Sequence, residues 1–247
     1  MQRLYGAQDF RLSYRSSEMK VAIMQPYFFP YIGYWQLINA VDTFVIYDDV
    51  FYIKQGWINR NNFLINGEKK LYTIKLSGAA SGRYINSIDV LDDFKKFCTM
   101  LKLNYSKAPY FYDIMNLVQR IIEFDEPNLS LFLANSIKSL SDFMGIKTKI
   151  IMSSTIEKNN ELKGEEKVLQ ICEILGAVQY YNSIGGMSLY DEFKFLQKGI
   201  EIKFLEATLS PYEQINNKFV PGLSILDVMF FNDLSTIRKI LEDYRLV

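Results

Sequence analysis

The sequence predicts an α/β fold with a Rossmann-like sheet, parallel or mostly parallel, and an accessory helical block. Three observations support this prediction. Short apolar runs of the kind that form buried parallel strands alternate with helical patterns at both ends of the 247-residue chain. The first run, the helix after it and the second run occupy about 30 residues, the length of a right-handed βαβ unit. Between the two alternating parts, residues 93–144 have continuous helical periodicity.

The predicted elements of the N-terminal half follow Met19. The first strand ends at Pro26, which cannot donate to a strand ladder. Asn66 and Gly67 predict a hairpin turn, because Asn-Gly adopts the left-handed conformation that two-residue hairpins need. In order, we expect a strand at 20–25, a rigid aromatic loop at 26–30, a helix at 33–40, a strand at 42–47, a β-rich segment at 51–77, a flexible loop at 77–82 and a strand at 84–91.

The helical block and the C-terminal half follow. Pro109 and Pro127 lie at helix starts, where the missing N–H of proline costs little, and Gly145 closes the block. Asn232 or Asp233 is expected to cap the last helix. The predicted order is helices at 93–105, 110–124 and 128–144, a strand at 148–152, a helix at 163–175, a strand at 178–182, a loop at 183–187, a helix at 189–197, a strand at 201–205, and helices at 224–231 and 234–244.

Residues 19–247 are predicted to form a single α/β domain. Residues 1–18 lack the apolar core of a signal peptide, and Met19 directly precedes the first strand. We expect residues 1–18 to be a disordered extension or the product of a non-native start. No apolar run approaches the roughly 20 residues that span a bilayer, so we expect a cytoplasmic protein without a membrane span.

The composition excludes several classes of function. The chain has no histidine, which removes histidine triads, histidine general bases and histidine metal sites. Cys98 and Cys172 cannot build a disulfide framework or a zinc cluster, and we expect buried, unreactive thiols. The 28 basic and 28 acidic residues cancel, which argues against binding to nucleic acid. The sequence predicts no metal site.

Polar motifs follow three of the predicted strands. Ligands of open parallel sheets bind beyond the carboxyl ends of the strands. We therefore expect one shared cleft at these ends. It would gather Gln25, Tyr27 and Tyr31 after the strand at 20–25, Asp48 and Asp49 after the strand at 42–47, and Asn182, Gly185 and Gly186 after the strand at 178–182.

Two of these motifs have specific chemical uses. Asp48 and Asp49 can supply a general base, a Mg²⁺ ligand or an acceptor for sugar hydroxyls, and a solvated strand end is the alternative. Adjacent carboxylates in a strand face opposite ways, so only one is expected to enter a cleft. Gly185 and Gly186 allow the backbone to approach a phosphate or a sugar closely, and a plain tight turn is the alternative.

Two further segments carry candidate side chains. In the segment WINRNN, the forked guanidinium of Arg60 suits phosphate or carboxylate, and Asn59 suits a sugar or an amide; a polar strand edge is the alternative. Near the C-terminus, Tyr212 and Glu213 line either a substrate pocket or a surface turn. Asp227 lies in an apolar helical stretch, so it either pairs with an arginine or a backbone donor or has a function.

Together these motifs resemble the WbqC-like family over residues 19–247. The resemblance implies a bacterial role in surface-polysaccharide gene clusters, such as those for O-antigen, lipopolysaccharide or capsule, and modification of nucleotide-linked amino sugars. The motifs that carry it are QPYFFP at 25–30, Gly33 with Tyr34, Asp48 with Asp49 and Val50, GWINR at 56–60, YNSIGG at 181–186, LYD at 189–191 and FVPGLSILD at 219–227.

The leading hypothesis is a transferase acting on a nucleotide-linked amino sugar. It would move an acyl or aminoacyl group to the sugar amine from a thioester, carried by an acyl carrier protein or coenzyme A. This reaction needs a base for the amine proton and donors for the tetrahedral oxyanion. The candidate bases are Asp48, Asp49 and Glu213, the candidate donors or phosphate ligands are Asn59, Arg60 and Asn182, and the aromatic rings that would stack on the nucleotide base are Tyr27, Tyr31 and Trp57.

Two alternatives stay open. One is a degenerate nucleotide- or nucleotide-sugar-binding scaffold without catalysis. The other is a nucleotidyl or glycosyl transferase with Mg²⁺ on Asp48 or Asp49. Residues 31–34 (YIGY) and 153–155 (SST) resemble the phosphate loops of nucleotidylyltransferases, but tyrosines stand where those enzymes need histidines. That likeness supports a related fold more than the same reaction.

Overall fold

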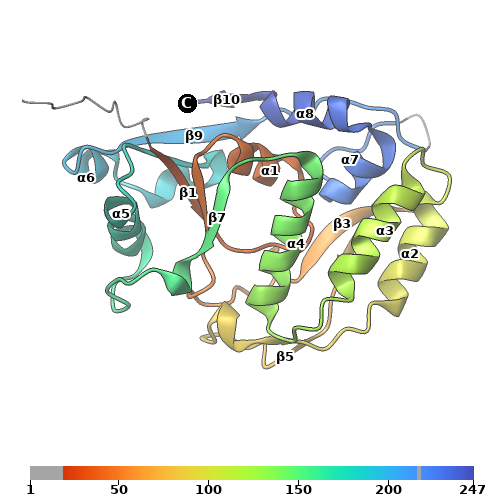
Figure 1. Cartoon of the computed structure of the whole chain (residues 1–247), viewed down its shortest axis with the longest axis horizontal. Coiled ribbons are helices and arrows are strands. Elements are labelled where there is room, and N and C mark those ends of the chain that lie inside the picture. Colours follow the sequence, from red (N-terminus) through yellow and green to blue (C-terminus); the bar gives the residue numbers. More distant parts are fainter. Residues whose placement is uncertain (1–18, 216–217) are drawn as a thin grey trace, which may run out of the picture.

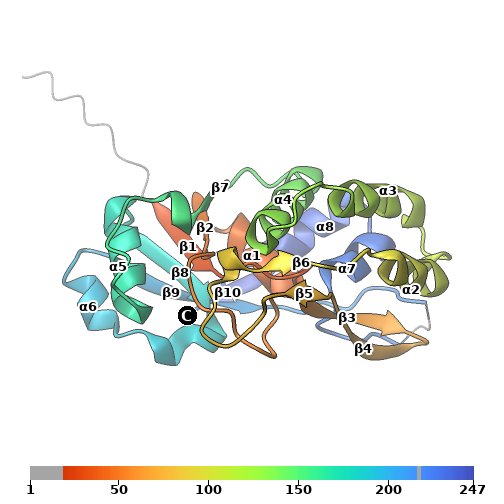
Figure 2. The same cartoon turned by 90° about the horizontal axis from the view of Figure 1, so that it is seen from below.

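A computed structural model describes residues 19–215 and 218–247 of the chain (Figure 1). The expected extension at 1–18 lies outside the described residues. A central sheet separates two groups of helices, one toward each end of the molecule (Figures 1 and 2). No helix within 19–215 or 218–247 combines the length and the apolar character needed to cross a bilayer.

The central sheet has six strands and a Rossmann-like order. Its spatial order is β10-β9-β8-β1-β2-β7, and every neighbouring pair is parallel except β10 with β9. The five parallel strands, numbered along the chain, therefore run 5-4-1-2-3, which is the 3-2-1-4-5 order of nucleotide-binding sheets viewed from the other face. The strands are β1 (Lys20–Met24), β2 (Thr43–Ile46), β7 (Lys149–Met152), β8 (Gln179–Ser183), β9 (Glu201–Ala207) and β10 (Tyr244–Leu246).

Alternating side chains divide the core between the two faces of the sheet. On one face, Val21 and Ile23 of β1 pack in a cluster with Val168 of α5 (Gly164–Ile174) and Phe195 of α6 (Glu192–Leu196). On the other face, Ala22 joins a larger cluster that includes side chains of α1 (Ile32–Asn39), α7 (Ile225–Phe231) and α8 (Leu234–Glu242). Burial on both faces explains why the central strands β1 and β2 appear as nearly continuous apolar runs.

The predicted helical block is confirmed as α2 (Lys95–Tyr105), α3 (Phe111–Ile122) and α4 (Leu129–Met144). The side chain of Asn128 accepts from the backbone N–H groups of Ser130 and Leu131 and caps α4, and Gly145 ends it with a φ of 80°. The buried side chains of all three helices belong to the larger core cluster. The block is therefore continuous with the core beside the sheet.

The hairpin turn is also confirmed. It joins β3 (Arg60–Ile65) to β4 (Glu68–Thr73), with φ angles of 54° at Asn66 and 77° at Gly67. The strand expected at 84–91 is mostly wrong: a 3-10 helix, Ile85–Ser87, precedes the two-residue β6 (Asp89–Val90), which pairs with β5 (Leu76–Ser77). The backbone N–H and the hydroxyl of Ser87 both donate to the Tyr84 carbonyl and close this turn.

The helix expected at 189–197 is shorter than predicted. A 3-10 helix, Ile184–Leu189, comes first, and α6 begins only at Glu192. The reason is local, because the Asp191 carboxylate accepts from the backbone N–H of Phe193 and caps α6 at that point. The antiparallel strand β10 was not expected, and it covers the outer edge of β9.

Candidate functional site

A cavity lies where the chain changes direction across the sheet. In the sheet, β2 and β7 lie on one side of β1, and β8 and β9 lie on its other side. The carboxyl ends of β1 and β8 therefore flank the point where the strand order reverses. A cavity of about 420 Å³ opens there, which we call the switch pocket. Its lining includes Gln25, Tyr27, Asn182, Gly185 and Gly186 from the sequence-predicted set.

A second cavity adjoins the first. It has a volume of about 310 Å³ and is lined by Tyr27, Pro30, Tyr31, Trp57, Asn61, Asn62, Lys69 and Gly222; we call it the aromatic pocket. Tyr27 lines both cavities and is the lining residue that they share. Trp57 and Tyr31 remain 44% and 36% exposed, so part of each side chain is accessible to a ligand.

The loop 25–31 between the pockets is held in place by buried hydrogen bonds. The Asn61 side-chain amide donates to the carbonyl oxygens of Phe28 at 3.0 Å and Phe29 at 2.7 Å. The Ser224 hydroxyl donates to the Phe29 carbonyl at 2.8 Å, and the Trp35 indole donates to the Pro30 carbonyl at 2.9 Å. These partners come from three different elements, so they preorganise the loop that carries Tyr27.

Tyr31 packs against the start of α1. A Cβ atom on Gly33 would lie 2.5 Å from the Tyr31 hydroxyl oxygen, so only glycine allows the ring to lie there. Burial raises the pKa of both Tyr27 and Tyr31 above the ordinary phenol value. Both phenols are therefore neutral near pH 7 and can donate hydrogen bonds.

Arg60 and Asn59 lie outside both cavities and support the loop that carries Trp57. The Arg60 guanidinium donates to the carbonyl oxygens of Gly56, at 2.8 Å, and of Gln55. The Asn59 side chain accepts from the Tyr52 hydroxyl at 2.8 Å and donates to the Ile74 carbonyl at 3.0 Å. Their donors and acceptors therefore serve the protein's own backbone and side chains.

Asp48 is buried and engaged. The residue is only 1% exposed. Its carboxylate accepts hydrogen bonds from the backbone N–H of Ser154 at 2.9 Å and from the side-chain amide of Asn86 at 3.5 Å. It does not line either of the two pockets. Its carboxylate joins the end of β2 to the segments that follow β7 and β5.

Asp49 is held between two lysines. Its carboxylate pairs with the ammonium groups of Lys158 at 2.8 Å and Lys167 at 3.0 Å, and these two lysine side chains are 1% and 5% exposed. Burial alone would raise the pKa of Asp49, but the hydrogen bonds from Lys158 and Lys167 outweigh it and leave the pKa below the ordinary value. Asp49 is therefore a weak base outside the two pockets.

Asp227 forms a buried network with neutral donors. Its carboxylate accepts from the hydroxyls of Tyr212 at 2.6 Å and Tyr105 at 2.9 Å, and from the Gln214 amide at 2.7 Å. Its partners are therefore side chains other than the arginine or backbone donor considered from the sequence. Burial raises the pKa of Asp227 and outweighs these donors. Neither Tyr212 nor Asp227 lines the two pockets, and Glu213 is exposed outside them.

The wall of the switch pocket formed by β8 is tightly packed. The Asn182 side-chain oxygen accepts from the backbone N–H of Ser183 at 2.7 Å, and its amide nitrogen donates to the hydroxyls of Tyr180 at 2.9 Å and Tyr190 at 3.0 Å. A Cβ on Gly186 would lie 3.2 Å from the Asn182 side chain. Gly186 therefore permits close packing here, whereas a Cβ on Gly185 would meet open space.

Several lining residues were missed in the sequence, among them Tyr190 and Glu165 of the switch pocket. Tyr190 belongs to the LYD motif, which contributed to the family resemblance but was given no function. Glu165 at the start of α5 had no signal, because acidic residues are common in first turns. The Glu165 carboxylate lines the switch pocket and accepts from Lys194 at 2.6 Å and from the backbone N–H of Asp191. The Lys194 hydrogen bond is the main reason that the pKa of Glu165 is lowered.

The two pockets thus bring together half of the predicted site residues. Gathered there are Gln25, Tyr27, Tyr31, Trp57, Asn182, Gly185 and Gly186. The residues that lie elsewhere are Asp48, Asp49, Asn59, Arg60, Tyr212, Glu213 and Asp227. Outside the undescribed segments, no group of three or more Cys, Asp or Glu side chains is arranged to hold a metal ion.

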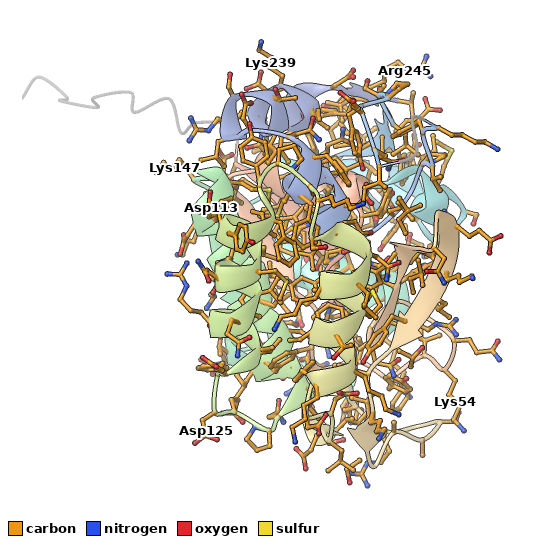
Figure 3. The ribbon with its side chains drawn as sticks, turned by 90° about the vertical axis from the view of Figure 1, so that its right-hand side faces the viewer. Lys54, Asp113, Asp125, Lys147, Lys239 and Arg245 are labelled. Atoms are coloured by element: carbon orange, nitrogen blue, oxygen red, sulfur yellow. The ribbon has the colours of Figure 1, made fainter. Side chains whose placement is uncertain are left out.

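A larger hollow lies away from the strand ends. Its volume is about 840 Å³, and α3, α4, α7 and α8 enclose it. Asp113 on its rim lies at the α8 end of α3 (Figure 3). Strand ends contribute none of the side chains that line it.

Comparison with known proteins places the chain in a sequence group. A family model described as "WbqC-like protein family" matches residues 25–239. The chain is 31% identical over 218 residues to "Uncharacterized protein Rv1507c" of Mycobacterium tuberculosis (strain ATCC 25618 / H37Rv), and the match covers 85% of this chain and 93% of that protein. No solved structure matches the chain significantly.

Proposed function

This chain belongs to the WbqC-like protein family, and we propose that it is a transferase acting on a nucleotide-linked amino sugar in bacterial surface-polysaccharide synthesis. The group transferred would be an acyl or aminoacyl group from a thioester of an acyl carrier protein or coenzyme A. One observation carries the proposal: two adjoining pockets at the switch point share the lining residue Tyr27. An elongated ligand with two distinct parts fits this arrangement.

The character of each pocket supports such a ligand. The switch pocket occupies the position where Rossmann-like sheets bind nucleotides. The aromatic pocket offers the partly exposed rings of Trp57 and Tyr31, and aromatic rings stack on planar bases. The nucleotide base would therefore lie in the aromatic pocket and the sugar beside Glu165 in the switch pocket, on opposite sides of Tyr27.

The transfer needs a base close to the sugar amine. The amine nitrogen forms a bond to the thioester carbon, the carbon–sulfur bond breaks, and the sulfur leaves as a thiolate. A base takes the amine proton and passes it to the thiolate, so that the thiol is released and the base is regenerated. Asp48, Asp49 and Glu213 lie outside both pockets. Glu165 also accepts from Lys194 and from the backbone N–H of Asp191, and its pKa is lowered, but it lines the switch pocket, so we assign the role of base to Glu165.

Binding and transfer are tested separately. Calorimetry with a panel of nucleotide sugars, with and without Mg²⁺, should give binding to at least one of them. Mass spectrometry of that sugar after incubation with acyl thioesters should then show a mass increase by the acyl group. Binding without a mass increase would favour the non-catalytic scaffold, and Mg²⁺-dependent release of nucleotide would favour nucleotidyl or glycosyl transfer.

The base is tested with a neighbouring control. Glu165→Gln should lower turnover about 10²–10⁴-fold while binding changes little. Glu166→Gln is the matched control, because Glu166 is exposed in the same helical turn and does not line the pocket. Equal turnover in the two variants would remove Glu165 from the mechanism.

A further inference from the structure

The hydrogen bonds of Asn182 determine which way its amide faces. Its side-chain oxygen accepts from the backbone N–H of Ser183 at 2.7 Å, and a backbone N–H can only donate. The amide nitrogen must therefore face the two phenol oxygens, of Tyr180 at 2.9 Å and Tyr190 at 3.0 Å. Each of its two protons goes to one tyrosine.

The two tyrosines then share a single hydrogen bond. Their hydroxyl oxygens are 3.1 Å apart, so one of the two hydroxyl protons lies between them and the other points elsewhere. Burial raises the pKa of both phenols, so both keep their protons near pH 7. The position of the remaining proton depends on which tyrosine donates.

Burial decides which tyrosine is the donor. Tyr180 is 0% exposed, and within 19–215 and 218–247 its hydroxyl has only Asn182 and Tyr190 as partners. If Tyr190 donated to Tyr180, the Tyr180 proton would be buried without an acceptor, which is strongly unfavourable. Tyr180 therefore donates to Tyr190. Tyr190 lines the switch pocket, and its own proton is left for an acceptor there.

We propose that Tyr190 is a ligand-binding donor of the switch pocket, which gives its hydroxyl proton to an uncharged oxygen of the nucleotide-linked sugar. This inference rests on the proposed function. The neighbouring carboxylate specifies the kind of acceptor: Glu165 lines the same pocket and accepts from the backbone N–H of Asp191, the residue after Tyr190. The charge of Glu165 is paired with Lys194 at 2.6 Å, and among the described residues that line the pocket there is no lysine or arginine to bind a phosphate. An amide or a pair of hydroxyls offers Tyr190 an acceptor and the Glu165 carboxylate a donor.

The test compares two variants that each remove one phenol oxygen. Tyr190→Phe removes the pocket-facing donor, and we expect the Kd for the bound nucleotide sugar to rise about 3–10-fold, as for the loss of one neutral hydrogen bond. Tyr180→Phe removes only the internal donor and leaves the Tyr190 proton free, so the Kd should stay within about twofold. A Kd unchanged in Tyr190→Phe, or raised equally in both variants, would overturn the inference.

Comparison of several probe ligands identifies which part of the ligand carries the oxygen that accepts from Tyr190. UDP and UDP-N-acetylglucosamine, with the GDP and dTDP equivalents, serve as probes by calorimetry. A loss of affinity for the diphosphates as well as the sugars places the acceptor on the nucleoside, and a loss confined to the sugars places it on the sugar. Either result supports a Tyr190 donor.

A ligand-free measurement separates this inference from the proposed function. Failure of the wild type to bind any nucleotide sugar would refute the proposed function and this identity of the ligand, but not the free Tyr190 donor. A high-resolution crystal structure of the unliganded protein should still show an ordered water within hydrogen-bond distance of the Tyr190 oxygen, on its pocket side. A protein acceptor at that position would overturn the inference.

Discussion

Asn61→Ala tests whether the loop between the two pockets is held from β3. Asn61 is 3% exposed, and its amide donates to the carbonyls of Phe28 and Phe29. Its side-chain oxygen also accepts from the backbone N–H of Asn62 at 2.7 Å. The substitution removes all three hydrogen bonds at once.

The expected loss follows from what each carbonyl keeps. The Phe29 carbonyl retains the Ser224 hydroxyl, whereas among the described residues the Phe28 carbonyl has Asn61 as its partner. A stranded buried carbonyl costs about 1–3 kcal/mol and each of the two other lost hydrogen bonds about 0.5–1.5 kcal/mol, so we expect a loss of about 2–6 kcal/mol. For a chain of this length, that corresponds to a Tm lower by about 4–24 °C.

Urea unfolding followed by circular dichroism measures the loss, and calorimetry measures the affinity for a nucleotide sugar. For the unfolding measurement, Asn62→Ala is the matched control, since Asn62 is the next residue on β3 and its side chain has no hydrogen bond to any described residue. It is not a control for affinity, because Asn62 lines the aromatic pocket. We expect the control to change the unfolding free energy by less than about 0.5 kcal/mol. If Asn61→Ala were as stable as Asn62→Ala, the loop would not depend on Asn61.

Three further predictions concern titratable groups. Asp49→Asn should lower the free energy of unfolding by about 3–5 kcal/mol at pH 7, because two buried ammonium groups lose their carboxylate. The folded pKa of Asp49 is below 3.8, so the difference in unfolding free energy between wild type and variant should fade as pH falls through that pKa. A difference that stays constant with pH would contradict this. The folded pKa of Asp227 is above 3.8, so ionising this carboxyl is harder in the folded than in the unfolded protein. The unfolding free energy of the wild type should therefore fall relative to that of Asp227→Asn as pH rises through the folded pKa. Parallel curves of unfolding free energy against pH would contradict this. Burial raises the pKa of Cys98 and Cys172, so a thiol reagent should label Cys172 only after unfolding; immediate labelling of the native protein would refute its burial.

Local patterns were sufficient to predict most of the fold. The central strands β1 and β2 are buried on both faces, so they appear as apolar runs, and the Asn66–Gly67 turn carries its own conformational preference. β10 was missed because its three residues, with Arg245 among them, have no apolar pattern. Its pairing with β9 is a tertiary contact that no local signal encodes.

The candidate site could be predicted only in part. The rule that ligands meet the carboxyl ends of strands located Gln25 and Asn182 in one pocket. The same rule could not separate Asp49 from the pocket, because its lysine partners come from the segment after β7 and from α5. The donors of Arg60 suit an anion equally well, but in the structure they bind the carbonyls of residues 55 and 56.

The central claim is that a nucleotide-linked sugar binds at the switch point. A crystal structure of the protein with the nucleotide sugar that binds most tightly in calorimetry tests it most directly. The account predicts that the ligand extends from the switch pocket into the aromatic pocket, in contact with Tyr27 and with an uncharged oxygen on the Tyr190 hydroxyl. Density for the ligand in the hollow enclosed by α3, α4, α7 and α8, with both pockets empty, would contradict it.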